Sequence, residues 1–384
     1  MLSDLKDLIP ELNTIRRHLH EYPEIAYKEF QTTQYIEETL KRWDLKFHPF
    51  KRLQTGGYCD VGEGPLMAFR ADIDGLAVKE NQEHSCRSQI PGVMHACGHD
   101  YHITLGLGLL RYFVQNKILN NRLRVIFQPA EEAYPGGAKD VIAENILRGC
   151  KVILTTHVLS DLAVGKIGLC QGVSSASSST LEIEISGPGG HTSRPHESVD
   201  LIRLTGAYLC LINDYIQQKT DPRLRYTLVF GEIKGGTAHN IIPQIISLRG
   251  TLRTLEVNLA VQIIDEIRQF SDQYSQTYGC TIIVNNPSTC PVVVNDQNLA
   301  KYFIDFVKAH KIEHEFVLLP QPSMGADDFA YYLDKIPGLY LKLGSGGKGR
   351  AHSGEFEADE TMLAPAMNHL ISFIKYLSCN RLII

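Results

Sequence analysis

The sequence of 384 residues lacks a basic excess, since 38 Lys and Arg stand against 43 Asp and Glu, for a net charge of −5. Without surplus positive charge to neutralise phosphates, nucleic-acid binding is not expected. The chain also contains no apolar run close to the length of about 18 residues that a transmembrane helix needs. Residues 1–24 are polar and charged, which predicts no signal peptide and a cytoplasmic location.

A paired-cysteine framework is also missing. The nine cysteines are an odd number and lie scattered from Cys59 to Cys379. In a chain without a leader this predicts reduced thiols, most of them buried, rather than disulfides. Hydrophobic residues make up 43% and charged residues 21% of the chain, which excludes a disordered protein. The open question is whether any one cysteine has a special role.

The length of the chain predicts two or three domains. Its predicted secondary-structure elements follow two different patterns, one in the outer segments and one in the middle. Short apolar strands separated by helical segments are typical of an α/β fold with a mainly parallel central sheet flanked by helices. Such strands are expected at 66–69, 123–128, 152–157 and 339–343, with helical patterns at 5–43, 99–113, 296–310 and 360–377.

The middle of the chain has a different order of elements. Strand, helix, two strands, helix and strand follow one another, which is the split βαβ pattern of a ferredoxin-like α+β module. These elements are expected at 181–185, 199–218, 228–233, 245–253, 256–278 and 281–284. The serine run at 174–179 before them indicates a connector, either a surface loop or a hinge. We therefore predict a larger domain of residues 1–178 and 291–384 with an inserted domain of residues 179–290.

Metal-binding side chains are concentrated at 94–102, Met-His-Ala-Cys-Gly-His-Asp-Tyr-His. Cys97 and His99 flank Gly98, which permits an unusual backbone conformation between two potential ligands. A thiolate with imidazoles is a donor set for a transition metal. The alternative is a buried thiol beside solvent-facing histidines.

Three further groups follow other predicted strands. Glu131 and Glu132 come directly after the strand at 123–128, and two adjacent carboxylates resist ionising together unless a cation compensates them. His157 ends another strand, and His352 lies in a glycine-rich loop after a fourth. Alone, each of these is more often structural. Together, at the strand ends of one α/β sheet, they predict a metal site.

In this order, these motifs resemble the aminoacylase/carboxypeptidase-type dinuclear metallopeptidases, in the amidohydrolase branch that includes hippurate hydrolases, auxin-conjugate hydrolases and N-acetyldiaminopimelate deacetylases. The resemblance covers nearly the whole chain. It rests above all on His-Ala-Cys-Gly-His-Asp at 95–100 and Gln-Pro-Ala-Glu-Glu at 128–132, with further motifs at 16–24, 70–76, 189–191, 235–243, 250–254 and 325–329.

The resemblance implies two divalent metal ions per chain, either zinc, manganese, cobalt or nickel. The implied ligands are Cys97, His99, Glu132, His157 and His352. Glu131 resembles the general base that takes a proton from the attacking water and passes it to the leaving amine. Asp72 matches an aspartate that supports the metal site. Arg70 stands where other branches have a ligand histidine, so it is not counted as a ligand.

The same resemblance gives the inserted domain the role of a lid and dimerisation domain. His191 resembles a histidine that reaches across a homodimer to stabilise the oxyanion of the reaction. Asn240 and Arg253 resemble residues that hold the free carboxylate of the substrate, a task that suits the guanidinium fork.

The implied function is metal-dependent cleavage of the amide bond of a small-molecule N-acyl-amino acid. The segment at 135–139, Pro-Gly-Gly-Ala-Lys, is similar to that of N-acetyldiaminopimelate deacetylases and favours small acetylated amino acids. Three alternatives stay open: a metal-dependent dipeptidase or carboxypeptidase, a hydrolase with Cys97 as nucleophile, and a non-catalytic homologue that binds acyl-amino acids.

Overall fold

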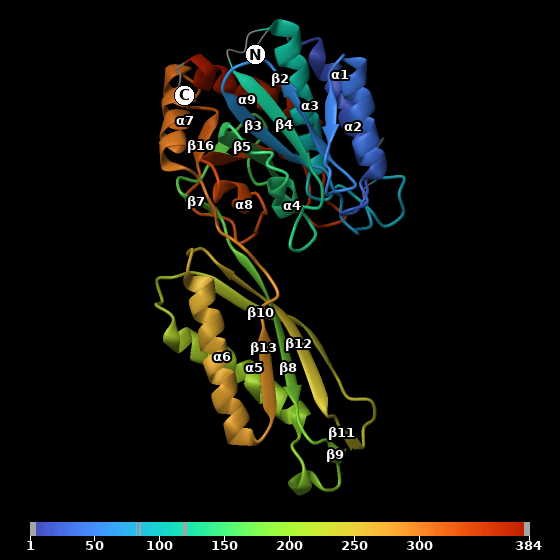
Figure 1. The fold of residues 1–384 in the computed structure, drawn as a ribbon, viewed down its shortest axis with the longest axis vertical. Helices are drawn as coiled ribbons and strands as arrows, with labels where there is room; N and C mark the ends of the chain where they lie inside the picture. Colours follow the sequence, from blue (N-terminus) through green and yellow to red (C-terminus); the bar gives the residue numbers. More distant parts are fainter. Residues whose placement is uncertain (1–4, 82, 84–85, 118–120, 380–384) are drawn as a thin grey trace. The chain divides into compact units, whose positions relative to one another are not determined.

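The computed structural model of the chain describes residues 5–81, 83, 86–117 and 121–379. The chain divides into two compact units, drawn in Figure 1. Unit 1 contains residues 1–174, 294–321 and 328–384, and unit 2 contains residues 175–293 and 322–327. The short segment 322–327 is assigned to unit 2 although the chain before and after it is assigned to unit 1.

Unit 1 is built on an eight-stranded sheet with the order β1-β2-β4-β3-β5-β17-β6-β16. The central strands β4, β3, β5 and β17 pair in parallel, which confirms the predicted mainly parallel sheet. Antiparallel pairs occur nearer the edges, at β1–β2, β2–β4 and β17–β6. The strands are β1 (Phe47–Pro49), β2 (Gly57–Val61), β3 (Leu66–Asp72), β4 (Arg122–Gln128), β5 (Cys150–Leu159), β6 (Ile167–Leu169), β16 (Phe316–Leu318) and β17 (Gly338–Gly344).

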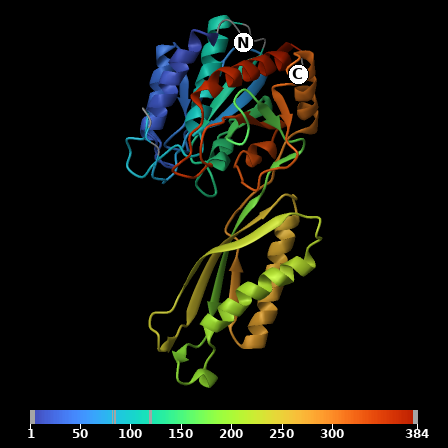
Figure 2. The ribbon, with the colours of Figure 1, turned by 180° about the vertical axis from the view of Figure 1, so that it is seen from behind.

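Helices cover this sheet, since every residue of β3 and β17 is buried. Helix α3 packs against β3 and β4, and α1 and α9 pack on α3 (Figures 1 and 2). In α1, Leu8, Leu12, Ile15 and Leu19 form the buried stripe that their three- and four-residue spacing predicts. The helices are α1 (Leu8–Glu21), α2 (Phe30–Arg42), α3 (His99–Asn116), α4 (Ala138–Ala143), α7 (Gln297–Ala309), α8 (Ala330–Leu333) and α9 (Leu363–Cys379), with a 3-10 turn at Glu360–Met362.

Unit 2 contains an antiparallel sheet with the order β10-β12-β8-β13 and two long helices, as the split βαβ pattern predicts. Its core lies between the helices and one face of the sheet, because alternate residues such as Leu181, Ile183 and Ile185 of β8 point inward. The elements are β8 (Ser178–Ser186), α5 (Leu201–Lys219), β10 (Tyr226–Gly235), β12 (Ile245–Thr254), α6 (Leu259–Tyr278), β13 (Thr281–Asn285), β14 (Thr289–Cys290), the short pair β9 (Gly190–His191) and β11 (Ile241–Ile242), and a 3-10 turn at Pro195–Glu197.

The serine run at 174–179 is not a surface loop. Its residues contribute to β7 (Val173–Ser175) and to the start of β8, and Ser174, Ser177 and Ser179 are buried. Their hydroxyls have local partners, as Ser177 Oγ and Thr254 Oγ1 are 2.8 Å apart. The chain passes from unit 1 to unit 2 within this run, and β15 (Val293–Val294) lies where it returns.

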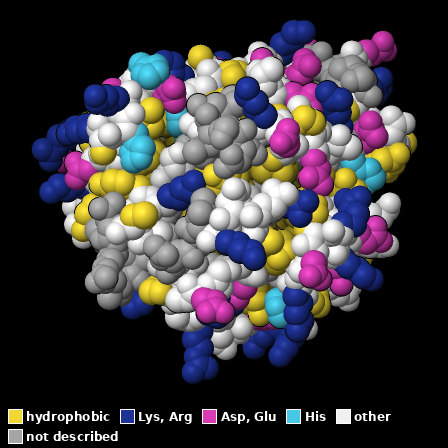
Figure 3. Space-filling model, turned by 90° about the horizontal axis from the view of Figure 1, so that it is seen from above, with side chains coloured by type: hydrophobic (Ala, Val, Ile, Leu, Met, Phe, Trp, Pro, Cys, Tyr) yellow, Lys and Arg dark blue, Asp and Glu magenta, His cyan; other side chains and the backbone are white. Residues whose placement is uncertain are grey.

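All nine cysteines are free thiols and six of them are buried, as the sequence predicts. Cys210 and Cys379 are exposed. Basic and acidic side chains are interspersed over the face drawn in Figure 3, in keeping with the balanced composition. Among the described residues, no helix combines the length and apolar character needed to cross a membrane.

Candidate metal centre

The five predicted ligands come together although they belong to four separate segments. Cys97 and His99 lie at the start of α3, Glu132 follows β4, His157 lies in β5, and His352 lies in the loop after β17. Strands β4, β5 and β17 run in the same direction, so the segments at their carboxyl ends meet at one edge of the sheet. The topology of unit 1 therefore builds the cluster.

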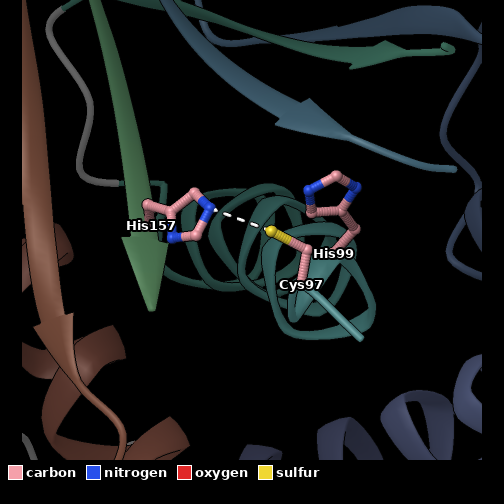
Figure 4. A group of neighbouring side chains, drawn as sticks. All are labelled: Cys97, His99 and His157. Atoms are coloured by element: carbon pink, nitrogen blue, oxygen red, sulfur yellow. Dashed lines mark hydrogen bonds between the residues drawn. The ribbon is translucent and has the colours of Figure 1, made fainter. Parts of the chain in front are cut away.

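Contacts within the cluster are short. Cys97 Sγ lies 3.3 Å from His157 Nε2, and Figure 4 shows these two side chains pointing toward each other. His352 Nε2 lies 3.2 Å from Glu132 Oε1. His99 Nε2 lies 3.9 Å from both Glu132 Oε1 and Glu131 Oε2. Glu131, the predicted base, is therefore part of the same group of side chains.

Gly98 sets the direction of the two ligands beside it. Its φ of +81° lies in the left-handed region that favours glycine, and it is the residue that precedes α3. A Cβ at this position would also lie 2.5 Å from Val158. The backbone turn lets Cys97 face His157 while His99 begins the helix (Figure 4).

Hydrogen bonds to backbone carbonyls fix one ring nitrogen of His157 and one of His99, and the other nitrogen of each ring faces the cluster. His157 Nδ1 donates to Val158 O at 2.8 Å, and His99 Nδ1 donates to Asp74 O at 2.9 Å. His99 Nε2 is buried without a hydrogen-bond partner, and Glu132 Oε1 is buried beside His352 Nε2. Buried nitrogen and oxygen atoms beside a thiol form a donor set that fits divalent transition metals.

The ionisation of Cys97 and His157 argues against a cysteine nucleophile. Burial raises the pKa of the Cys97 thiol to about 12, and the charge of Glu132 acts in the same direction. Burial and the nearby Lys342 hold the pKa of His157 well below its usual value. A nucleophilic cysteine needs a low thiol pKa and a competent base. A bound cation would instead favour the thiolate as a ligand.

Asp72 supports the cluster from β3. Its Oδ1 accepts from His102 Nδ1 at 2.5 Å, and its Oδ2 lies 3.6 Å from His99 Nε2. Burial acts to raise the pKa of Asp72, but Arg70, His99 and His102 together hold it well below the usual range. His102 Nε2 accepts from the Val158 amide, so both ring nitrogens of His102 are used and it is not a further ligand.

Arg70, which is not among the predicted ligands, has a structural partner on either side. Its Nη1 donates to Asp72 and its Nη2 to Asp328, both at 2.6 Å, and its Nε donates to Gln128 at 3.0 Å. The guanidinium is fully buried between two carboxylates. It therefore compensates negative charge that would otherwise accumulate behind the predicted metal ligands.

The predicted substrate residues all belong to unit 2, and they lie in two places. His191 and Asn240 are neighbours at the β9–β11 pair, since the Thr192 amide donates to Asn240 O. Both are exposed, and His191 Nδ1 accepts from Ser193. Arg253 is the second-to-last residue of β12, and its Nη1 donates to Met324 O. The strand from Ile245, where β12 begins, to Arg253 is roughly 25 Å long, so Arg253 lies far along β12 from the end that follows β11.

Asp74 and His102, which are not among the predicted site residues, also contact this centre. Asp74 accepts from the backbone amides of Glu131 and Glu132, and His102 bonds to Asp72. Both belong to motifs that were recognised, at 70–76 and 94–102. A signal for Asp74 was present in its spacing of two residues from Asp72 at a strand end, which places both on the same side of the chain.

A mainly parallel α/β sheet with nitrogen, sulfur and oxygen donors at its carboxyl edge, and a second carboxylate beside them, is an arrangement that suits a metal-dependent hydrolase. The sequence matches Peptidase family M20/M25/M40 over residues 68–376, and the chain belongs to this family.

Individual relatives agree with this assignment. An N-acetyl-L-cysteine deacetylase of Bacillus subtilis is 34% identical over 99% of this chain and 90% of the relative. An N-acetyldiaminopimelate deacetylase of Bacillus velezensis is 33% identical over 95% of this chain and 98% of the relative. The crystal structure of a dinuclear metal-binding peptidase of the M20 family from Bacillus subtilis superposes with a TM-score of 0.84 at 28% identity, covering 97% of this chain and 99% of that one.

Proposed function

We propose that this chain is a dinuclear metal-dependent amidohydrolase that cleaves N-acyl-amino acids, with N-acetyl-amino acids, including N-acetyldiaminopimelate, as the first candidates. The observation that carries the proposal is the meeting of five potential ligands with Glu131 at one edge of the sheet. The deacetylases among the similar proteins support the acetyl group as the acyl part.

Each side chain has a role in this proposal. Cys97, His99, Glu132, His157 and His352 would hold two divalent ions, with zinc, manganese, cobalt and nickel as candidates. When bound, such ions polarise the acyl carbonyl and favour ionisation of water at neutral pH. Glu131 accepts the proton of the attacking water and delivers it to the leaving amine. Asp72 holds His102, and through it the backbone beside His157, in place.

Unit 2 supplies substrate recognition in the proposal, and the protein is a homodimer through this unit in the cytoplasm. His191 of a partner subunit stabilises the oxyanion, and Asn240 and Arg253 bind the substrate carboxylate. Within one copy of unit 2, His191 and Asn240 lie apart from Arg253, which supports a site to which two subunits contribute these side chains.

The test is hydrolysis of a panel of substrates by one preparation whose metal content is measured. The panel contains N-acetyl, N-benzoyl and longer N-acyl amino acids together with dipeptides, each with added zinc, manganese, cobalt or nickel. We expect fastest release of the amine from N-acetyl-amino acids and about two metal ions per chain.

Other outcomes separate the alternatives. Faster cleavage of dipeptides would assign a dipeptidase or carboxypeptidase instead. Binding of acyl-amino acids without turnover, at full metal content, would assign a non-catalytic homologue. Turnover that persists after complete removal of metal would contradict the proposal and favour a cysteine nucleophile.

A further inference from the structure

The turn that carries Glu131 and Glu132 has an unusual backbone. Ala130, directly before them, has a φ of +58° and is fully buried. A non-glycine residue populates this left-handed conformation less than the right-handed one, by roughly a factor of ten or more. In an extended segment, neighbouring side chains point to opposite sides. A left-handed residue before the pair changes the direction of the chain, and both glutamate side chains lie within 3.9 Å of His99 Nε2.

Two buried carboxylates hold this turn through three consecutive amides. Glu29 Oε1 accepts from the Ala130 amide at 2.8 Å. Asp74 Oδ1 accepts from the Glu131 amide at 3.1 Å, and Asp74 Oδ2 accepts from the Glu132 amide at 2.8 Å. Both carboxylates come from other parts of unit 1, since Glu29 precedes α2 and Asp74 follows β3.

Both residues make further hydrogen bonds, Glu29 through its carboxylate and Asp74 through its backbone carbonyl. Glu29 is fully buried, and its Oε1 accepts from the Tyr27 amide at 2.9 Å while its Oε2 accepts from Thr55 Oγ1 at 2.7 Å. The backbone carbonyl of Asp74 accepts from His99 Nδ1 at 2.9 Å. Residue 74 therefore connects a predicted ligand ring to the backbone of the predicted base and of a second ligand.

We propose that Glu29 and Asp74 are positioning residues that stabilise the left-handed conformation of Ala130 and thereby direct Glu131 and Glu132 into the same centre. This inference rests on the proposed function for the roles of the two glutamates. It adds two side chains, 45 residues apart in the sequence, that accept hydrogen bonds from three consecutive backbone amides of the turn.

The first test compares two conservative changes. In Glu29→Gln the amide oxygen still accepts from the Ala130 and Tyr27 amides, and the Thr55 hydroxyl can reverse its bond, so kcat should stay within about threefold of wild type. In Asp74→Asn the new NH₂ group faces a backbone N–H, which has no acceptor to offer. We expect kcat to fall at least about thirtyfold with KM changed less than about threefold. Equal effects of the two changes would overturn the proposal.

The second test is rescue. Glu29→Ala should lower kcat by roughly thirtyfold, and adding Ala130→Gly should recover roughly tenfold, because glycine adopts φ > 0 without penalty. Lys311→Gly is the matched control, since Lys311 has a φ of +56° in an exposed turn away from the cluster. It offers the same relief of backbone strain and should recover nothing. Rescue by the control, or none by Ala130→Gly in a folded double variant, would contradict the inference.

A metal-binding measurement separates this inference from the proposed function. Competition with a chelator gives the zinc affinity of each variant, which should fall in Glu29→Ala and recover in the double variant with Ala130→Gly because Glu132 is a predicted ligand. If the wild type hydrolyses no member of the panel, the proposed function fails, while the affinity series still decides the inference. If Glu29→Ala does not fold, the comparison of Glu29→Gln with Asp74→Asn decides it.

Discussion

The two units hold their functional side chains in opposite ways. In unit 1, His99, Asp72 and Asp74 are buried, and each is fixed by hydrogen bonds to groups that are themselves buried. In unit 2, His191 lies exposed in a strand of two residues, with Ser193 beside it. In unit 1 the side chains are held in place by contacts within one chain. In unit 2 the side chain is exposed at the surface, where it can contact a substrate or another subunit.

The ion pairs of the two units differ in the same sense. Arg70 and its two carboxylate partners are removed from solvent, so the energy of each depends on the others being present. Arg249 and Glu182 pair across β12 and β8 at 3.3 Å with about half of each side chain exposed. Water competes with this second pair, and it should contribute little. Variants in the two units therefore test the comparison directly.

The largest effect is expected in unit 1, at Glu131. Glu131→Gln removes the proton acceptor while keeping the volume of the side chain, so kcat should fall on the order of a thousandfold with metal content unchanged. Turnover and bound metal are measured on the same sample. Glu63→Gln, at an exposed position of unit 1, is the control and should be neutral. Near-normal turnover in Glu131→Gln would remove this residue from the mechanism.

Next in size is the loss of the buried guanidinium. Arg70→Gln removes the positive charge that lies between the buried carboxylates of Asp72 and Asp328, and the free energy of unfolding should fall by roughly 3–5 kcal/mol. The matched change Arg249→Gln in unit 2 should cost less than about 1 kcal/mol. Denaturant titration of both variants checks the pair. Similar losses of unfolding free energy in the two variants would show that burial does not make the ion pairs of unit 1 more important for stability than those of unit 2.

A smaller effect is expected from unit 2. His191→Ala should lower kcat on the order of a hundredfold without altering metal content or unfolding. His196→Ala, exposed in the neighbouring 3-10 turn, is the control. In the proposed homodimer, co-expression of His191→Ala and Glu131→Gln chains with different tags should give mixed dimers with one intact site each and about half of the wild-type rate. Mixed dimers without activity would place His191 in the site of its own chain.

The smallest effect is a dependence of stability on pH. Burial raises the pKa of Glu29 to about 7 from 4.5. Between these values the folded protein binds more protons than the unfolded chain, so this group makes stability fall as pH rises through the window. Glu29→Gln cannot ionise. Its stability relative to wild type should therefore increase between pH 5 and pH 8, on the order of 2 kcal/mol, as measured by denaturant titration at both pH values. No change would mean that Glu29 titrates normally.

The elements that could be predicted are those whose residues carry a local pattern. Strands β3, β4 and β5 are apolar runs, and α1 has a stripe of leucines, so each could be recognised from neighbouring residues. Strand β6 has three residues and contains no such pattern. It forms because β17 offers an edge to pair with, a cause that lies far away in the sequence.

In the candidate site, too, some residues could be recognised from a local pattern and others only from long-range contacts. Cys97, His99, Glu131 and Glu132 lie in dense motifs, and the chemistry of their side chains suggested their roles. Glu29 carries no such motif, because its contact with Ala130 joins positions 101 residues apart. The amphipathic helix that begins after Glu29 explains its neighbours without giving the carboxylate a role.

By itself the sequence determined the family, the α/β and split βαβ orders of secondary-structure elements, and which side chains could serve as ligands and base. The tertiary structure decided how those side chains are held. Parallel strand ends bring four segments to one edge, Asp72 and Asp328 surround Arg70, and Glu29 and Asp74 fix the turn before the paired glutamates. The physical reason is that ligand chemistry is a property of single residues, whereas orientation depends on buried bonds between positions that only folding brings together.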